Sequence, residues 1–107
     1  MNRRRFQDRN RNRNGKVFIV VAYDISDDRR RTRLHKKLKG FGTPVQYSVF
    51  ECILSPKDLE RMKKAVRGVI KEGEGDTVRY YILCEACRRR ILTINGAVTR
   101  EEYAVIV

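Results

Sequence analysis

The sequence predicts an α+β protein in which two helices cover one face of a mainly antiparallel sheet. Two observations support this prediction: apolar runs of strand length alternate with two amphipathic segments, and glycine or proline separates many of these segments. The resulting order is strand, helix, strand, helix and three further strands. Because two helices cover only one face and the first two strands are apolar at successive positions, we expect a second copy of the chain to bury the other face.

The first predicted strand covers residues 17–23, a continuous apolar run rich in β-branched residues that is typical of a strand buried on both faces. A helix follows, for which Ser26 and Asp27 are candidate N-caps and Gly40 or Gly42 is the stop. Its thin apolar stripe consists of Leu34, Leu38 and Phe41.

Residues 44–54 predict either one strand or a kinked pair of short strands. The second helix is predicted over residues 55–73, because Ser55 can cap it, Pro56 suits its first position and Gly73 can end it. Its apolar stripe consists of Leu59, Met62, Val66, Val69 and Ile70. The remaining predicted strands are 77–83, 91–95 and 102–107.

The charge of the chain points to a polyanionic partner. Its 107 residues include 25 Lys and Arg against 13 Asp and Glu, a formal net charge of +12, which favours nucleic acid over an acidic metabolite. The longest apolar run is too short to cross a bilayer, so we expect a cytoplasmic protein without a membrane partner. Three cysteines are an odd count, which makes a disulfide framework improbable.

A basic N-terminal arm is predicted over residues 1–15, ahead of a folded domain at 16–107. Residues 1–16 contain seven basic residues and one acid. Because so polar a segment cannot bury enough apolar surface to offset the conformational entropy lost on ordering, we expect the arm to be disordered. The arm either lies along phosphates, or is a disordered solubilising tail or the remnant of an upstream start codon.

Asp24 is the candidate catalytic and metal-binding residue, because it ends the first strand, where side chains are commonly presented to ligands. The alternative is that Asp24 caps the following helix, although Ser26 and Asp27 are closer to the helix start. If Asp24 of two copies converged, Mg²⁺ between them would relieve the repulsion and keep water ligands, one of which could attack a phosphodiester. Mn²⁺ is the alternative ion.

Four arginines near the start of the first helix are candidate nucleic-acid ligands. They are Arg29, Arg30, Arg31 and Arg33, and arginines at a helix N-terminus suit phosphate binding. A solvated charged face is the alternative for Arg29 and Arg30. We expect His35 to face solvent, and Cys84 and Cys87, a lone CxxC pair, to be semi-buried thiols at a strand end.

The segments "VAYDISDDRRRTRLHKKLKGFG", "VQYSVFECIL" and "VRYYIL" resemble the small CRISPR-associated nuclease family, the Cas-two proteins, across residues 16–107. The resemblance implies a ferredoxin-like homodimer in which residues 102–107 complete the sheet of the partner. It also implies a metal-dependent endonuclease acting on single-stranded RNA or duplex DNA in antiviral defence. The same family bridges two CRISPR integrase dimers during spacer acquisition.

Carried over onto this sequence, the resemblance places the metal-binding aspartate at Asp24, beside Tyr23, and the arginines of the first helix at Arg31 and Arg33. The strand-two aromatic falls on Phe50, and Ser48 precedes it as a further supporting residue. Two other functions remain open from the sequence: a non-catalytic DNA-binding assembly protein, and a toxin-like ribonuclease outside CRISPR.

Overall fold

A four-stranded antiparallel sheet forms the centre of the protein. The computed structural model describes residues 11–101. Its strands are β1 Val17–Asp24, β2 Gly42–Gln46, β3 Val49–Leu54 and β4 Thr77–Leu83. They lie in the order β2-β3-β1-β4, and every neighbouring pair is antiparallel. Each long helix connects two strands that flank a third, so the two β-α-β units interleave as in a ferredoxin-like fold. The predicted fold class is confirmed.

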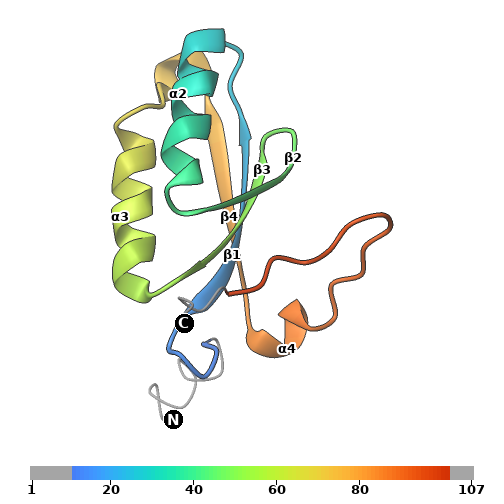
Figure 1. Cartoon of the computed structure of the whole chain (residues 1–107). Coiled ribbons are helices and arrows are strands. Elements are labelled where there is room, and N and C mark those ends of the chain that lie inside the picture. Colours follow the sequence, from blue (N-terminus) through green and yellow to red (C-terminus); the bar gives the residue numbers. More distant parts are fainter. Residues whose placement is uncertain (1–10, 102–107) are drawn as a thin grey trace, which may run out of the picture.

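The two long helices, α2 Asp28–Lys39 and α3 Pro56–Arg67, lie on the same side of the sheet (Figure 1). The Asp27 side chain caps α2 by accepting a hydrogen bond from the Arg30 N–H at 2.9 Å. The Ser55 hydroxyl caps α3 in the same way, from the Asp58 N–H at 3.1 Å. Two shorter elements follow, the 3₁₀ turn η1 Glu72–Glu74 and the helix α4 Glu85–Arg88.

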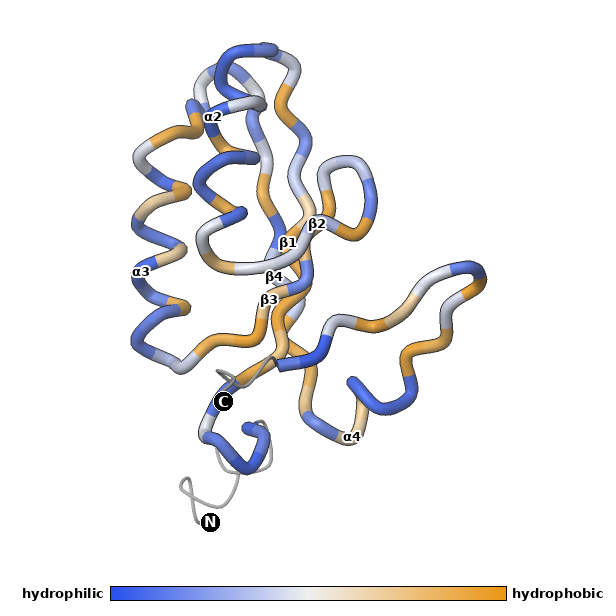
Figure 2. Tube along the Cα trace, viewed as in Figure 1, coloured by the Kyte–Doolittle hydropathy of each residue, from blue (hydrophilic) through white to orange (hydrophobic). Residues whose placement is uncertain are grey.

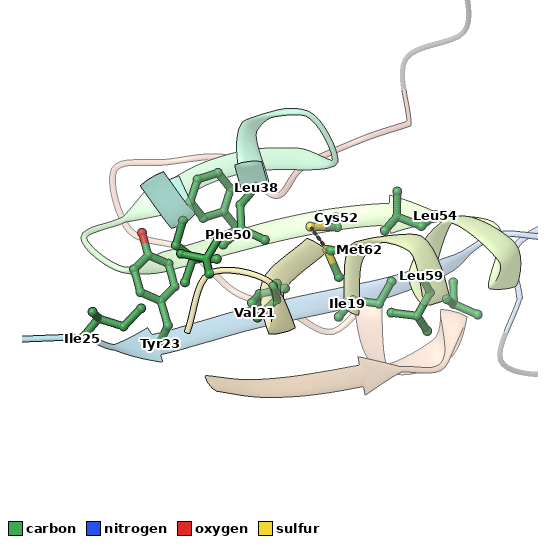
Figure 3. Packing of buried hydrophobic residues seen from close by; sticks show 14 residues of the cluster. Ile19, Val21, Tyr23, Ile25, Leu38, Phe50, Cys52, Leu54, Leu59 and Met62 are labelled. Carbon is green, nitrogen blue, oxygen red and sulfur yellow. Dashed lines mark hydrogen bonds between the residues drawn. The ribbon is translucent and has the colours of Figure 1, made fainter. Parts of the chain in front are cut away.

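The hydrophobic core fills the space between the sheet and these helices (Figure 3). Alternate residues of a strand point to opposite faces, and the alternate residues of β1 that face the helices are Val17, Ile19, Val21 and Tyr23. Phe50 and Cys52 of β3 face the helices as well and are fully buried. Burial of these side chains is the main driving force for packing the helices on the sheet.

The side of the sheet away from α2 and α3 is called the open face below. Asp24 ends β1 on this face, because it follows the core residue Tyr23 and pairs with Thr77 of β4. By the same register, the open face also contains Val20, Ala22, Val49, Glu51, Ile53, Arg79, Tyr81 and Leu83. The segment after α4 lies on this side (Figure 1), where the Thr99 N–H donates to the Glu51 carboxylate at 3.0 Å.

Two sequence predictions about elements are wrong. The second helix ends at Arg67 rather than at Gly73, so Val69 and Ile70 pack on the core from the segment that follows it. Residues 91–95 are not a strand: their alternating apolar side chains, Leu92 and Ile94, are 93% and 98% exposed. The pair of short strands over 44–54 is confirmed, as is the strand over 77–83.

The predicted arm and the predicted last strand fall largely outside the described residues, since 1–10 and 102–107 are not described. Residues 11–15 form part of a turn, in which the side-chain oxygen Oδ1 of Asn12 accepts hydrogen bonds from the N–H groups of Asn14 and Lys16. Within residues 11–101, no helix combines the length and the apolar composition that a membrane span requires.

Candidate functional site

Asp24 presents an exposed carboxylate at the end of a buried strand. Within residues 11–101 this carboxylate forms no hydrogen bond and no ion pair, and Asp27 caps α2 instead. The capping explanation of Asp24 is therefore unnecessary. The Asp24 carboxylate therefore has no protein partner within residues 11–101, and the other face of its strand packs on the core. It is available to bind a cation or a water molecule.

A cleft of about 330 Å³ lies beside the end of β1, between α2 and the turn that joins β2 to β3. It is called the α2 cleft below. Its lining residues are Tyr23, Arg31, Thr32, His35, Lys36, Lys39, Gln46, Tyr47 and Ser48. Four of these are lysine, arginine or histidine, and none is acidic, so the α2 cleft favours an anionic ligand.

The turn between β2 and β3 is fixed against the end of β1. Ser48 adopts a left-handed backbone conformation with φ of 62°, which costs energy in a residue other than glycine and needs support from its surroundings. Its carbonyl accepts a hydrogen bond from the Tyr23 N–H at 3.1 Å. The turn leaves the Tyr47 ring 80% exposed, with the Arg31 guanidinium carbon 6.0 Å from the ring centre.

Tyr23 and Phe50 connect the cleft to the core. Their ring centres are 6.4 Å apart at an interplanar angle of 29°, and both residues lie at one end of the core (Figure 3). Burial raises the pKa of the Tyr23 hydroxyl, and a hydrogen bond with the Ser48 side chain opposes this shift. Phe50 is fully buried, so it supports the site only through packing.

The four predicted arginines have different environments. Arg31 lines the cleft, donating to the Ile25 carbonyl at 2.9 Å and pairing with Asp28. Arg29 and Arg33 are exposed. Arg30 is buried and forms an ion pair with Asp76, so its guanidinium is not available to bind phosphate.

Sequence reasoning missed several lining residues of the α2 cleft: Thr32, Lys36, Lys39, Gln46 and Tyr47. The spacing of Arg31, His35 and Lys39 places them on one helix face, and this was the available signal. His35, expected to face solvent, is half-buried and packs edge-on against Phe50, with ring centres 5.1 Å apart.

Only one member of the CxxC pair matches the expectation of a semi-buried thiol at a strand end, since Cys84 directly follows β4. Cys84 is the N-cap of α4 and is half-buried, whereas Cys87 is exposed.

A single chain offers little for a metal ion. Within the described part, no group of three or more His, Cys, Asp or Glu side chains could hold one. Asp24 supplies one hard oxygen ligand, which suits Mg²⁺, an ion that commonly keeps several waters and uses one or two carboxylates. The donor chemistry fits Mg²⁺ if a second copy brings its own Asp24 to the same place.

The ferredoxin-like scaffold thus combines an exposed strand-end carboxylate, a candidate cation ligand, with a basic, aromatic cleft that suits an anionic ligand. A model of the family described as CRISPR associated protein Cas2 matches residues 17–91. The chain belongs to this family, as the resemblance of the sequence implied.

Two relatives illustrate the similarity in sequence. The chain is 44% identical over 84 residues to the CRISPR-associated endoribonuclease Cas2 3 of Chloroflexus aurantiacus. The aligned residues make up 78% of this chain and 89% of that protein. The chain is 45% identical over 67 residues to the CRISPR-associated endonuclease Cas2 2 of Thermus thermophilus, covering 63% and 73%.

Solved structures share the fold. A hypothetical protein from Thermus thermophilus matches with a TM-score of 0.66 and 36% identity, covering 82% of this chain and 100% of that one. A chain of a partial Cas6-RT-Cas1–Cas2 complex matches with a TM-score of 0.65 and 26% identity, covering 85% and 98%.

Proposed function

We propose that the chain is a nuclease of a CRISPR adaptation system, which hydrolyses phosphodiester bonds of RNA or duplex DNA with Mg²⁺ bound at Asp24. The observation that carries this proposal is the exposed carboxylate of Asp24, which has no partner within residues 11–101 and follows directly on Tyr23, a lining residue of the basic α2 cleft. The names of the relatives, endoribonuclease and endonuclease, support the reaction class.

The proposed active form is a homodimer formed through the open face. This face contains partly exposed apolar residues on three strands, including Val20 of β1 and Val49 of β3, and Tyr81 of β4 is 47% exposed. Burying such a surface against a second copy removes apolar area from water. Because Asp24 lies at the end of β1 on the same face, a symmetric pairing can bring two Asp24 carboxylates together.

In the proposed mechanism the residues of this chain bind and orient the substrate. Arg31, Lys36 and Lys39 hold the sugar-phosphate backbone in the α2 cleft, and the exposed Tyr47 ring offers a surface on which a base can stack. Two Asp24 carboxylates would hold Mg²⁺, which when bound stabilises charge on the phosphate and acidifies a water molecule. The rigid strand fixes the position of Asp24 relative to the cleft.

A second candidate function is a scaffold that binds nucleic acid and bridges CRISPR integrase dimers without cutting. The structural match to a chain of a Cas1–Cas2 complex favours this role. The two functions are compatible, because the open face and the cleft can serve assembly whether or not Asp24 holds a metal ion.

The test compares cleavage of labelled RNA and duplex DNA by the wild type, Asp24→Asn and Glu60→Gln, with Mg²⁺ and with chelator. Asn keeps the size of Asp but removes the charge that binds the metal, so we expect Asp24→Asn to lose metal-dependent cleavage. Glu60→Gln removes an equal charge on the exposed face of α3 and should cut normally. Mn²⁺ in place of Mg²⁺ tests the alternative ion.

Light scattering should give a dimer mass for all three proteins at micromolar concentration. Full metal-dependent cleavage by a carefully purified Asp24→Asn protein would refute the site. Absence of cleavage in the wild type, together with normal duplex binding and integrase binding, would leave the scaffold as the function.

A further inference from the structure

A second, larger hollow lies at the opposite end of β1 from Asp24. Its volume is about 920 Å³, and it is lined by the turn before β1, by α4 and by residues 100–101. It is called the basic hollow below. Figure 2 shows hydrophilic residues in the turn before β1 and near the end of α4, at the same end of the sheet. The proposed chemistry at Asp24 leaves this surface unexplained.

One carboxylate holds the wall of the basic hollow in place. Glu101 accepts hydrogen bonds from the side-chain amides of Asn12 at 2.8 Å and Asn14 at 3.0 Å, and it pairs with the Lys16 ammonium at 2.8 Å. The Lys16 contact, together with both amides, holds the pKa of Glu101 below its usual value. Glu101 is therefore charged at neutral pH and ties the turn before β1 to the segment that follows α4.

The basic residues that line the basic hollow outnumber its acidic residues. Its lining includes two acidic residues, Glu85 and Glu101, against the six basic residues Arg11, Arg13, Lys16, Arg88, Arg89 and Arg100, a net charge of +4. Both acids are already paired, Glu85 with Arg88 at 2.7 Å and Glu101 with Lys16.

Arg11, Arg13 and Arg100 form no hydrogen bond or ion pair with any of residues 11–101. Three unpaired guanidinium groups around one hollow favour a ligand with several negative charges.

The lining selects the type of anion. Guanidinium groups match phosphate geometry in two-point hydrogen bonds, whereas the one aromatic residue of the lining, Phe18, is only 3% exposed and cannot stack on a base. The hollow therefore suits the sugar-phosphate backbone without reading the base sequence.

The position of the hollow relates it to Asp24. Phe18 and Ile53 pair with each other on the open face, the same face that holds Asp24. Asp24 lies six residue steps along β1 from Phe18, a distance of about 20 Å at 3.3 Å per residue. The hollow therefore lies at the far end of this face from the place where a dimer would bring two Asp24 carboxylates together.

We propose that the basic hollow is a second nucleic-acid site, which holds the phosphodiester backbone of RNA or DNA through Arg11, Arg13 and Arg100. The inference rests on the proposed function only in taking nucleic acid as the polyanion. The hollow contributes affinity that is independent of base sequence and steeply dependent on salt.

The test uses the full chain and the triple variant Arg11→Gln/Arg13→Gln/Arg100→Gln. The matched control is Lys57→Gln/Lys64→Gln/Arg67→Gln, which removes the same charge from exposed positions of α3 on the other side of the sheet. Fluorescence anisotropy gives the Kd for a labelled RNA and for a labelled DNA duplex, in chelator, over a series of salt concentrations. Chelator separates binding from any metal-dependent cleavage, and circular dichroism verifies folding.

We expect the triple variant to weaken binding at least about tenfold at low salt. The slope of log Kd against log salt should fall by about 2 to 3, since each lost contact accounts for about 0.9 on duplex DNA and about 0.7 on a single strand. The α3 control should retain a clearly steeper slope than the triple variant. A loss with only one of the two nucleic acids identifies that one as the ligand.

A triple variant that binds both nucleic acids like the α3 control overturns the inference. A triple variant whose mass in light scattering differs from that of the wild type also overturns it, because the hollow would then be an interface between copies. An active nuclease with an unchanged slope overturns this inference alone. If the wild type does not cleave nucleic acid but the salt slope of its binding still depends on the three arginines, only the proposed nuclease activity is refuted.

Discussion

Arg30 and Asp76 form a two-point ion pair in the interior of the protein. The Arg30 Nε lies 2.8 Å from Oδ2 of Asp76, and Nη2 lies 3.1 Å from Oδ1. Nη1 of the same guanidinium is 2.6 Å from the Glu74 carboxylate. The pair joins α2 to the residue that precedes β4. An arginine from a run that suits phosphate binding by its sequence therefore holds two elements of the fold together.

Replacing Arg30 by Met should destabilise the protein strongly, because the Asp76 carboxylate would stay buried without its partner. We expect the melting temperature to fall by about 10 °C or more. The neighbouring exposed Arg29 provides the control, and Arg29→Met should change the melting temperature by only a few degrees. Calorimetry of the two variants checks this, and an equal effect of both would contradict the structural role of Arg30.

The ion pair should also make stability depend on acid pH. The Arg30 guanidinium and the Lys71 N–H hold the pKa of the Asp76 carboxyl below its usual value. Because the folded-state pKa is the lower one, the stabilisation is fully present above the unfolded-state pKa, at about 4, and is lost as the pH falls through the folded-state pKa.

The melting temperatures of the wild type and Asp76→Asn should therefore differ most near pH 6 and converge below about pH 4. A difference that stays constant down to about pH 2 would show that ionisation of Asp76 does not stabilise the fold.

The three cysteines should react at different rates. Burial raises the pKa of the Cys52 thiol to about 12, and the side chain is fully enclosed by the core. Cys84 accepts a hydrogen bond from the Cys87 N–H at 3.4 Å, which lowers the pKa of Cys84, and Cys87 is exposed.

An alkylating reagent at pH 8 should label Cys84 first, then Cys87, and should reach Cys52 only in denaturant. Mass spectrometry of timed samples measures the order. Labelling of Cys52 in the native protein at the rate of Cys84 would contradict the packing around β3.

Tyr47 should contribute to binding of single strands through its ring. Tyr47 is 80% exposed and the Arg31 guanidinium carbon lies 6.0 Å from the centre of its ring. Stacking of one base on an aromatic side chain corresponds to roughly a 5-fold to 150-fold change in affinity. We expect Tyr47→Ala to weaken RNA binding in chelator by this factor. Tyr47→Phe keeps the ring and should bind like the wild type, whereas equal weakening by both variants would assign the effect to the hydroxyl.

Local signals explain why much of the fold could be predicted from the sequence. Asp27 and Ser55 cap the helices that follow them, and the apolar run of β1 is long enough to indicate a buried strand. The predicted strand over residues 91–95 was wrong because alternating apolar residues form a strand only where the edge of a neighbouring strand is available. Leu92 and Ile94 meet no such edge within residues 11–101.

The site was predictable only in part. Asp24 and Arg31 could be found because one ends a strand and the other starts a helix. Tyr47 could not be found, because its position at the α2 cleft depends on the left-handed backbone of Ser48. A left-handed conformation at a residue other than glycine is uncommon and cannot be predicted from the sequence. The ion pair of Arg30 with Asp76 was equally hidden, since 46 positions separate the two residues.

The hydrogen bonds from Asn12 and Asn14 to Glu101 bring residues 11 and 101 to the same corner of the sheet, far from Asp24. A protein domain fused before residue 11 or after residue 101 would therefore leave the molecule at that corner and need not pass the α2 cleft. A tether attached at residue 11 or at residue 101 should therefore leave the molecule far from Asp24. The same tether would stand over the basic hollow, so binding measured on a surface should underestimate the contribution of its arginines.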